Sequence, residues 1–154
     1  MDRDKIYERV QLAYDALVYG KAPIKPLLEG IDESYANDVT DEFVVPYLVN
    51  EDAVIRENDA VIFANFRPDR AIQISVAITN PKETTLTRYV EFKDITYVSM
   101  MLYSDKVLGK VNFGLQQLTD MYGDVIANLG YKQLRIAETE KYAHVTYFFD
   151  GGVD

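Results

Sequence analysis

An apolar run that stops abruptly on charged residues constrains this chain more than any other feature of its sequence. Residues 60–66 read AVIFANF, apolar throughout except for Asn65, and the tetrapeptide RPDR follows at residues 67–70. An unbroken apolar run of this length is typical of a strand covered on both faces, as in a parallel sheet. Proline and aspartate are favourable at a helix start, so the sequence predicts a strand that leads directly into a helix.

The stretch that follows, residues 71–79, fits two periodicities. Its apolar residues alternate as in a strand, and Ala71, Ile74 and Ile78 also form a helical stripe. The helix-start residues in front of this stretch favour a helix, which the Asn-Pro pair at residues 80–81 would end.

Helical and β-prone segments alternate along the rest of the chain. Helices are predicted where apolar residues recur at helical spacing and glycine follows, at residues 4–19 and 119–129, the second capped by Thr119. Residues 21–30 contain two prolines and are predicted to form a loop. A short helical turn is predicted at residues 32–37. Strands are predicted at residues 97–103, 133–137 and 144–149, with an edge or irregular strand at 40–49. This alternation predicts an α/β fold, a mainly parallel sheet with flanking helices.

Length and composition limit the possible functions. The 154 residues predict one domain with a sizeable core, and no stretch of the sequence reads as a linker. The net charge of −9 argues against general binding to nucleic acid or to an anionic membrane, although a few convergent arginines can still form a local basic site. The absence of cysteine excludes thiolate metal sites and makes a reducing cytoplasm the expected compartment. The one histidine, His144, is predicted to be structural.

Arg67 and Arg70 have two interpretations. Ligands of open α/β sheets gather at the carboxyl ends of strands, where two guanidinium groups beside a helix start would bind a phosphate or carboxylate. Alternatively, Asp69 and neighbouring acids simply pair with these arginines. Spacing alone favours the paired turn.

Two further cations are candidates for anion binding. Lys141 lies between two glutamates, and by itself reads as a solvated lysine. Arg3 lies at a predicted helix start, where its charge opposes the helix dipole. A bound anion would resolve that conflict, and so would a disordered chain end.

Four blocks of the sequence occur in a characteristic order. They are MDRDKIYERVQLAYDALVYG, ESYANDVTDEFVVP, NDAVIFANFRPDRAIQ and KQLRIAETEKYAHVTYFFDGG. Together they resemble consecutive blocks of the cofactor-independent (2,3-bisphosphoglycerate-independent) phosphoglycerate mutases, with similar spacing. Residues 81–117 match this family least well.

The resemblance implies a part of a larger, two-domain enzyme. Members of the family have a phosphatase-like domain, into which a phosphoglycerate-handling domain is inserted. Residues 1–135 resemble the later part of the inserted domain, and residues 136–154 resemble the hinge and the first strand leading back to the phosphatase-like domain. The family's nucleophilic serine and the ligands of its two manganese ions have no counterpart here. We therefore expect the isolated chain to be catalytically incomplete.

The resemblance also implies a role for four cations. Arg3 in MDRD, Arg67 and Arg70 in RPDR, and Lys141 in ETEKY are identical to substrate-binding residues of the family. The family interconverts 3-phosphoglycerate and 2-phosphoglycerate in glycolysis through a phosphoserine intermediate. Closure about the hinge would bring the four cations over the metals.

Two other interpretations of the sequence stay open. One is a non-catalytic anion-binding or interaction module derived from the same domain. The other is a structural or oligomerisation role, in which the predicted strand at residues 144–149 has an exposed edge that pairs with a second copy of the chain.

Overall fold

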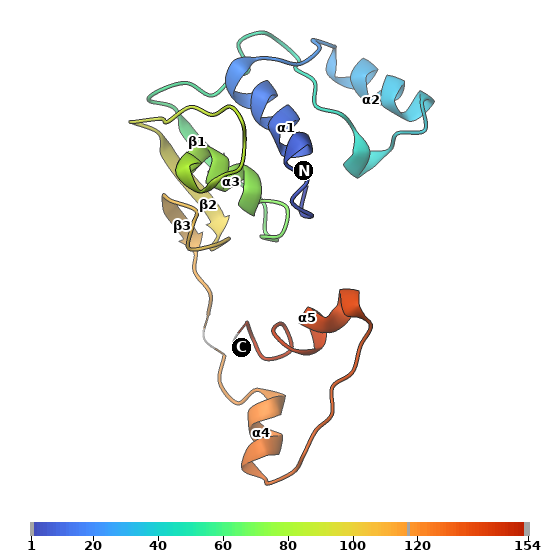
Figure 1. The fold of residues 1–154 in the computed structure, drawn as a ribbon, viewed down its shortest axis with the longest axis vertical. Helices are drawn as coiled ribbons and strands as arrows, with labels where there is room; N and C mark the ends of the chain where they lie inside the picture. Colours follow the sequence, from blue (N-terminus) through green and yellow to red (C-terminus); the bar gives the residue numbers. More distant parts are fainter. Residues whose placement is uncertain (1, 117, 153–154) are drawn as a thin grey trace. The chain divides into compact units, whose positions relative to one another are not determined.

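The structure is a computed structural model that describes residues 2–116 and 118–152. The chain divides into two compact units, Met1–Gly114 and Leu115–Asp154 (Figure 1). Chain length had predicted one domain, and this expectation is wrong, because the residues on either side of position 114 pack mainly within their own unit. The two units are described separately below.

The first unit is built on a parallel sheet of three strands in the order β1, β2, β3. The strands are β1 (Ala60–Phe63), β2 (Thr96–Met101) and β3 (Lys110–Phe113). Ala60 pairs with Thr96, and Val98 pairs with Lys110. Helix α3 (Ile72–Thr79) lies between β1 and β2 in the chain. The predicted α/β fold with a mainly parallel sheet and flanking helices is confirmed.

Helices cover one face of this sheet. Helix α1 (Tyr7–Tyr19) packs on α3, and the two helices bury a core with side chains of the sheet (Figure 1). The core residues are Val10, Tyr14, Ile74, Ala77, Ile78, Leu86 and Tyr97. Ile62 and Phe66 are 71% and 72% exposed. The prediction that the 60–66 run is covered on both faces is therefore wrong for the described residues.

A short connection carries the chain from β2 to β3. Parallel neighbours require a crossover, and residues 102–109 make it across the C-terminal end of α3. The Leu108 N–H donates to the Thr79 hydroxyl at 3.0 Å, and the Asn80 side chain donates to the Lys106 carbonyl at 3.2 Å. The short 3₁₀ helix η2 (Pro81–Glu83) follows α3, and Glu83 pairs with Lys106 at 2.8 Å.

Residues 20–59 have little regular secondary structure. They contain α2 (Leu27–Ala36), the 3₁₀ helix η1 (Asp41–Phe43), and one isolated parallel bridge between Ile24 and Leu48. The predicted loop ends earlier than expected, because α2 begins directly after Pro26. The predicted irregular strand at residues 40–49 is reduced to that single bridge.

The second unit contains short helices and extended chain. They are α4 (Tyr122–Asn128), the 3₁₀ helix η3 (Thr139–Lys141) and α5 (Tyr142–Val145). Helix α4 confirms the predicted helix at 119–129, although it begins after Met121 and not after Thr119.

The strands predicted at residues 133–137 and 144–149 are wrong. Residues 133–137 have no regular secondary structure, and residues 144–149 form the end of α5 and the turns after it. A strand needs a neighbour to satisfy its N–H and C=O groups, and no strand of the second unit is available among the described residues. Local turns satisfy the backbone instead, as in the bond from the Phe148 N–H to the Ala143 carbonyl at 2.9 Å. The predicted strand edge for pairing with a second copy is therefore absent from this segment.

None of the described helices has both the length and the apolar character that crossing a membrane requires.

Candidate functional site

The RPDR tetrapeptide lies where β1 gives way to α3. The Pro68 carbonyl accepts hydrogen bonds from the N–H groups of Ala71 and Ile72, at 2.8 and 3.0 Å. This turn leads straight into the helix, as the sequence predicted. Arg67 and Arg70 therefore stand at the carboxyl end of a strand in a parallel sheet, which is the usual position for ligand-binding residues in such folds.

Tyr103 fixes the chain between β1 and this turn. Its hydroxyl lies 3.0 Å from the Phe63 carbonyl and also contacts the Asn65 carbonyl. Its ring meets that of Phe63 edge-on, with centroids 5.9 Å apart. Burial raises the pKa of Tyr103, so its hydroxyl keeps the proton that it donates. No sequence pattern had marked this residue.

The N-terminal segment reaches the same turn. The Arg3 guanidinium lies 3.5 Å from the Asp69 carboxylate, although 66 positions separate the two residues. Both side chains are about half exposed. Beside this pair, the buried carboxylate of Asp2 accepts a hydrogen bond from the Gln73 amide at 3.2 Å. The structure thus brings MDRD and RPDR together.

Arg70 and Arg67 differ in their contacts. Arg70 is 28% exposed and pairs with Glu42 of η1 at 2.5 Å. Arg67 is exposed, and its side chain makes no ion pair or hydrogen bond within residues 2–116 and 118–152. Arg70 is thus paired, although with Glu42 and not with Asp69, and Asp69 pairs with Arg3.

These ion pairs leave the arginines available to an anion. Exposed ion pairs contribute only about 0–1 kcal/mol to stability. A phosphate or carboxylate that accepts bidentate hydrogen bonds from a guanidinium can therefore displace Asp69 from Arg3. Arg67 and Arg70 thus lie in the turn between β1 and α3, and Arg3 contacts that turn through Asp69.

Lys141 lies in the second unit, at the end of η3. Its ammonium group is 3.2 Å from the Glu138 carboxylate, and both side chains are more than half exposed. The first unit thus gathers three of the four predicted cations, and the fourth belongs to the other unit.

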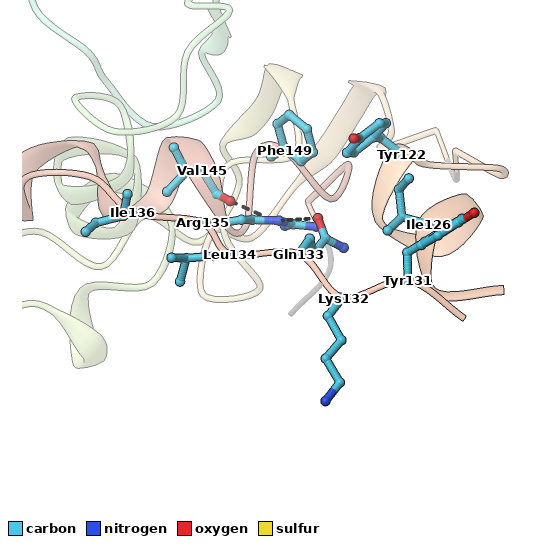
Figure 2. A pocket seen from close by; sticks show the side chains of 10 residues that line it. All are labelled: Tyr122, Ile126, Tyr131, Lys132, Gln133, Leu134, Arg135, Ile136, Val145 and Phe149. Atoms are coloured by element: carbon cyan, nitrogen blue, oxygen red, sulfur yellow. Dashed lines mark hydrogen bonds between the residues drawn. The ribbon is translucent and has the colours of Figure 1, made fainter. Parts of the chain in front are cut away.

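The second unit has an open cavity of about 540 Å³ beside its extended chain (Figure 2). Aromatic and aliphatic side chains form most of its lining, together with Arg135. The Arg135 guanidinium pairs with the Asp150 carboxylate and donates to the Gln133 side chain at 3.1 Å and the Val145 carbonyl at 3.3 Å. It also lies over the Phe149 ring, 4.8 Å from the centroid. The Arg135 guanidinium is thus held by contacts within the second unit.

Comparison with known proteins places the chain in a family. The family model described as "BPG-independent PGAM N-terminus" matches residues 1–105, and the Metalloenzyme superfamily model matches residues 108–154. The chain belongs to the BPG-independent phosphoglycerate mutase family. The resemblance inferred from the four sequence blocks is confirmed.

Curated members of the family match the whole of this chain. It is 50% identical to the 2,3-bisphosphoglycerate-independent phosphoglycerate mutase of Acholeplasma laidlawii and 46% identical to that of Listeria monocytogenes, over 99% of its own length. It spans 32% and 31% of these relatives, about a third. A crystal structure of Leishmania mexicana phosphoglycerate mutase at low cobalt concentration matches with a TM-score of 0.74 and 28% identity, over 99% of this chain and 30% of that one. The chain is thus a part of a larger mutase fold.

The residues of this mutase segment do not fit a metal ion by themselves. Among the described residues, no three His, Asp or Glu side chains gather at one point. The Metalloenzyme match nevertheless indicates a metal-dependent family.

Proposed function

We propose that this chain is the part of a phosphoglycerate mutase that binds the substrate, through Arg3, Arg67, Arg70 and Lys141. The observation that supports this most directly is the contact of Arg3 with Asp69, which brings MDRD onto the RPDR turn. The substrates would be 3-phosphoglycerate and 2-phosphoglycerate. Each carries a phosphate and a carboxylate, and more than one arginine is needed to pair with both groups.

The proposed role of these residues is to bind the substrate and to orient it. The guanidinium groups would neutralise the substrate and fix its direction, which places the reacting oxygen correctly. They would also hold the glycerate while its phosphoryl group is carried elsewhere in the enzyme. Lys141 would join them from the second unit.

The remaining chemistry would come from other segments of the full-length enzyme. By resemblance to the family, this is a phosphatase-like domain with a nucleophilic serine and two manganese ions, acting in glycolysis in the cytoplasm. Residues 1–135 would belong to the substrate-binding domain and residues 136–154 to the hinge. Among the described residues, no group of three potential metal ligands lies together.

Titration of the isotope-labelled chain with 3-phosphoglycerate, followed by NMR, tests the proposal. We expect the amide signals of residues 2–6 and 67–73 to shift. Arg67→Ala or Arg70→Ala should weaken binding by at least about tenfold, since a charged hydrogen bond contributes about 1.5–3 kcal/mol. Arg56→Ala is the matched control, because Arg56 is an exposed arginine that precedes β1 and pairs with Asp52.

Two results would contradict the proposal. Absence of shifts near Arg67 and Arg70 at millimolar ligand would show that the chain does not form the site. Equal affinity for inorganic phosphate and 3-phosphoglycerate would show a general anion site instead.

A non-catalytic anion-binding module is the second candidate, favoured by the absence of metal-ligand groups among the described residues. It makes the same binding prediction. The two candidates differ in the neighbouring coding sequence, because only the enzyme requires the serine and metal-ligand motifs in the same reading frame.

A further inference from the structure

Asp2 is a buried carboxylate directly beside Arg3 in the chain. Its side chain is 1% exposed, whereas the side chain of Arg3 is 56% exposed. A buried carboxylate is destabilising unless its neighbours compensate its charge. Its contacts therefore indicate which parts of the chain it holds together.

Two parts of the first unit meet at the Asp2 carboxylate. One of its oxygens, Oδ2, accepts a hydrogen bond from the Ile6 N–H at 2.9 Å and from the Gln73 amide at 3.2 Å. The same amide donates to the Asp2 main-chain carbonyl at 3.1 Å. The Arg9 guanidinium lies 3.9 Å from the other oxygen. Asp2 thus closes the turn of residues 2–6 and attaches it to α3.

The turn of residues 2–6 depends on these contacts. Lys5 has a φ of 62°, in the left-handed region that residues other than glycine seldom adopt. Local preference therefore disfavours this conformation. The hydrogen bond across the turn and the contact with Gln73 hold it in place.

The attachment to α3 runs beside the arginine site. Gln73 follows Asp69 by four positions, so a helical path brings the two residues to one side. Asp2 contacts Gln73, and the next residue, Arg3, contacts Asp69. The contact of Arg3 with Asp69 is exposed and weakened by water and salt, whereas the contact of Asp2 with Gln73 is partly buried.

We propose that Asp2 and Gln73 are positioning residues, which hold Arg3 beside Arg67 and Arg70 while a phosphoglycerate displaces Asp69. This inference rests on the proposed function and extends it to two residues that do not touch the substrate. The partly buried Asp2–Gln73 contact keeps the segment on α3, so Arg3 can exchange its partner without leaving the site.

The test is to exchange the carboxylate and the amide between positions 2 and 73. Gln73→Glu places a second carboxylate against Asp2, and the two charges repel. Asp2→Asn removes the carboxylate that the amide and Arg9 compensate. The double variant Asp2→Asn/Gln73→Glu again has one carboxylate and one amide, with their positions exchanged. Asp4→Asn is the matched control, since it makes the same chemical change on an exposed residue of the same segment.

Two measurements are made on the 154-residue chain and on each of its variants. The heteronuclear NOE of amides 3–5, without ligand, reports whether the segment is held. NMR titration with 3-phosphoglycerate reports affinity. We expect Gln73→Glu and Asp2→Asn to lower the NOE and to weaken binding by at least about fivefold. The double variant should recover part of both losses, because it restores the side-chain pair but not the bond from residue 73 to the main-chain carbonyl of residue 2. Asp4→Asn should match the unaltered chain.

Each other outcome has a definite meaning. An unchanged NOE in both single variants, or no recovery in the double variant, would overturn the inference. So would a loosened segment with unchanged affinity. If Gln73→Glu does not fold, the comparison of Asp2→Asn with the unaltered chain decides. If the unaltered chain does not bind 3-phosphoglycerate, the proposed function fails, while the NOE still shows whether Asp2 and Gln73 hold the segment.

Discussion

At the scale of single residues, the arginine site combines firm and exchangeable contacts. Arg3 and Arg70 pair with exposed carboxylates, and such pairs are weak in water. Asp2 and Tyr103, whose hydrogen bonds hold the backbone near these arginines, are buried. The backbone around the site is thereby held, while the guanidinium groups remain able to change partners.

Asp2 should make the stability of the first unit depend on pH. Burial alone would raise the pKa of Asp2. Hydrogen bonds from the Ile6 N–H, the Gln73 amide and the Asp4 N–H, together with the charge of Arg9, outweigh burial and lower the pKa. A carboxyl with a lowered folded-state pKa stabilises the folded state above its unfolded-state pKa of about 4, and this contribution is lost as pH falls through the folded-state value.

Urea titration of the unaltered chain and of Asp2→Asn at several pH values measures this effect. The unaltered chain should be the more stable near neutral pH, and the difference should shrink below about pH 4. A difference that stayed constant down to low pH would show that Asp2 is not the titrating group.

Tyr103→Phe removes the hydroxyl that contacts two carbonyls after β1. We expect the free energy of unfolding of the first unit to fall by about 1 kcal/mol, the usual contribution of one hydrogen bond. Urea titration followed at the amides of β1 and β2 would measure it. Tyr89→Phe is the comparison, because Tyr89 is 41% exposed. Equal effects of the two substitutions would argue against a special role for Tyr103.

At the scale of elements, the sequence predicted those with a clear pattern. Helices α1 and α3 and strands β1 and β2 have apolar periodicity or helix-start residues, and all four form close to the predicted positions. Strand β3 was missed because it is four residues long and exposed along its length, so no buried face marks it. The site followed the same rule: charged motifs identified the arginines, whereas the contacts of Asp2 with Ile6 and Gln73 form only in the folded chain.

Helix α2 offers a test of packing against helix propensity. Alanine is better than glycine in a helix by about 1 kcal/mol, so Gly30→Ala would ordinarily stabilise α2. A Cβ at position 30 would, however, lie 2.5 Å from the Tyr47 ring, whose hydroxyl is bonded to the Leu27 carbonyl. We expect Gly30→Ala to destabilise the first unit by about 1 kcal/mol.

The Tyr47→Ala background is the control for this effect. Without the ring, Gly30→Ala should become neutral or stabilising in the same thermal or urea measurement. Destabilisation of equal size in both backgrounds would exclude the ring as the cause.

At the scale of the whole molecule, the chain consists of two compact units. It spans about a third of the length of its curated relatives. Short segments of the second unit leave large apolar side chains in water, with Leu134 87% exposed. A chain this long can bury one sizeable core, and here that core is confined to the first unit. Sequence patterns could not show this division, because β-prone residues look the same whether or not a partner strand is present.

The purified 154-residue chain should not interconvert 3-phosphoglycerate and 2-phosphoglycerate. Its described residues contain no group that could hold a metal, and the family model for residues 108–154 is that of a metalloenzyme. An enolase-coupled assay with added manganese would test this, with the full-length Listeria monocytogenes mutase as the positive control. Measurable turnover by the chain alone would contradict the proposed division of labour.

The path of residues 102–109 has a consequence for the order of assembly. The chain reaches β3 only after passing over the end of α3, where Thr79 and Asn80 bond to it. We therefore expect β3 to take its register on β2 after α3 has docked, with α1, α3, β1 and β2 forming first. Mechanical tension on the chain beyond β3 would peel this strand away first, leaving the arginine site behind it intact.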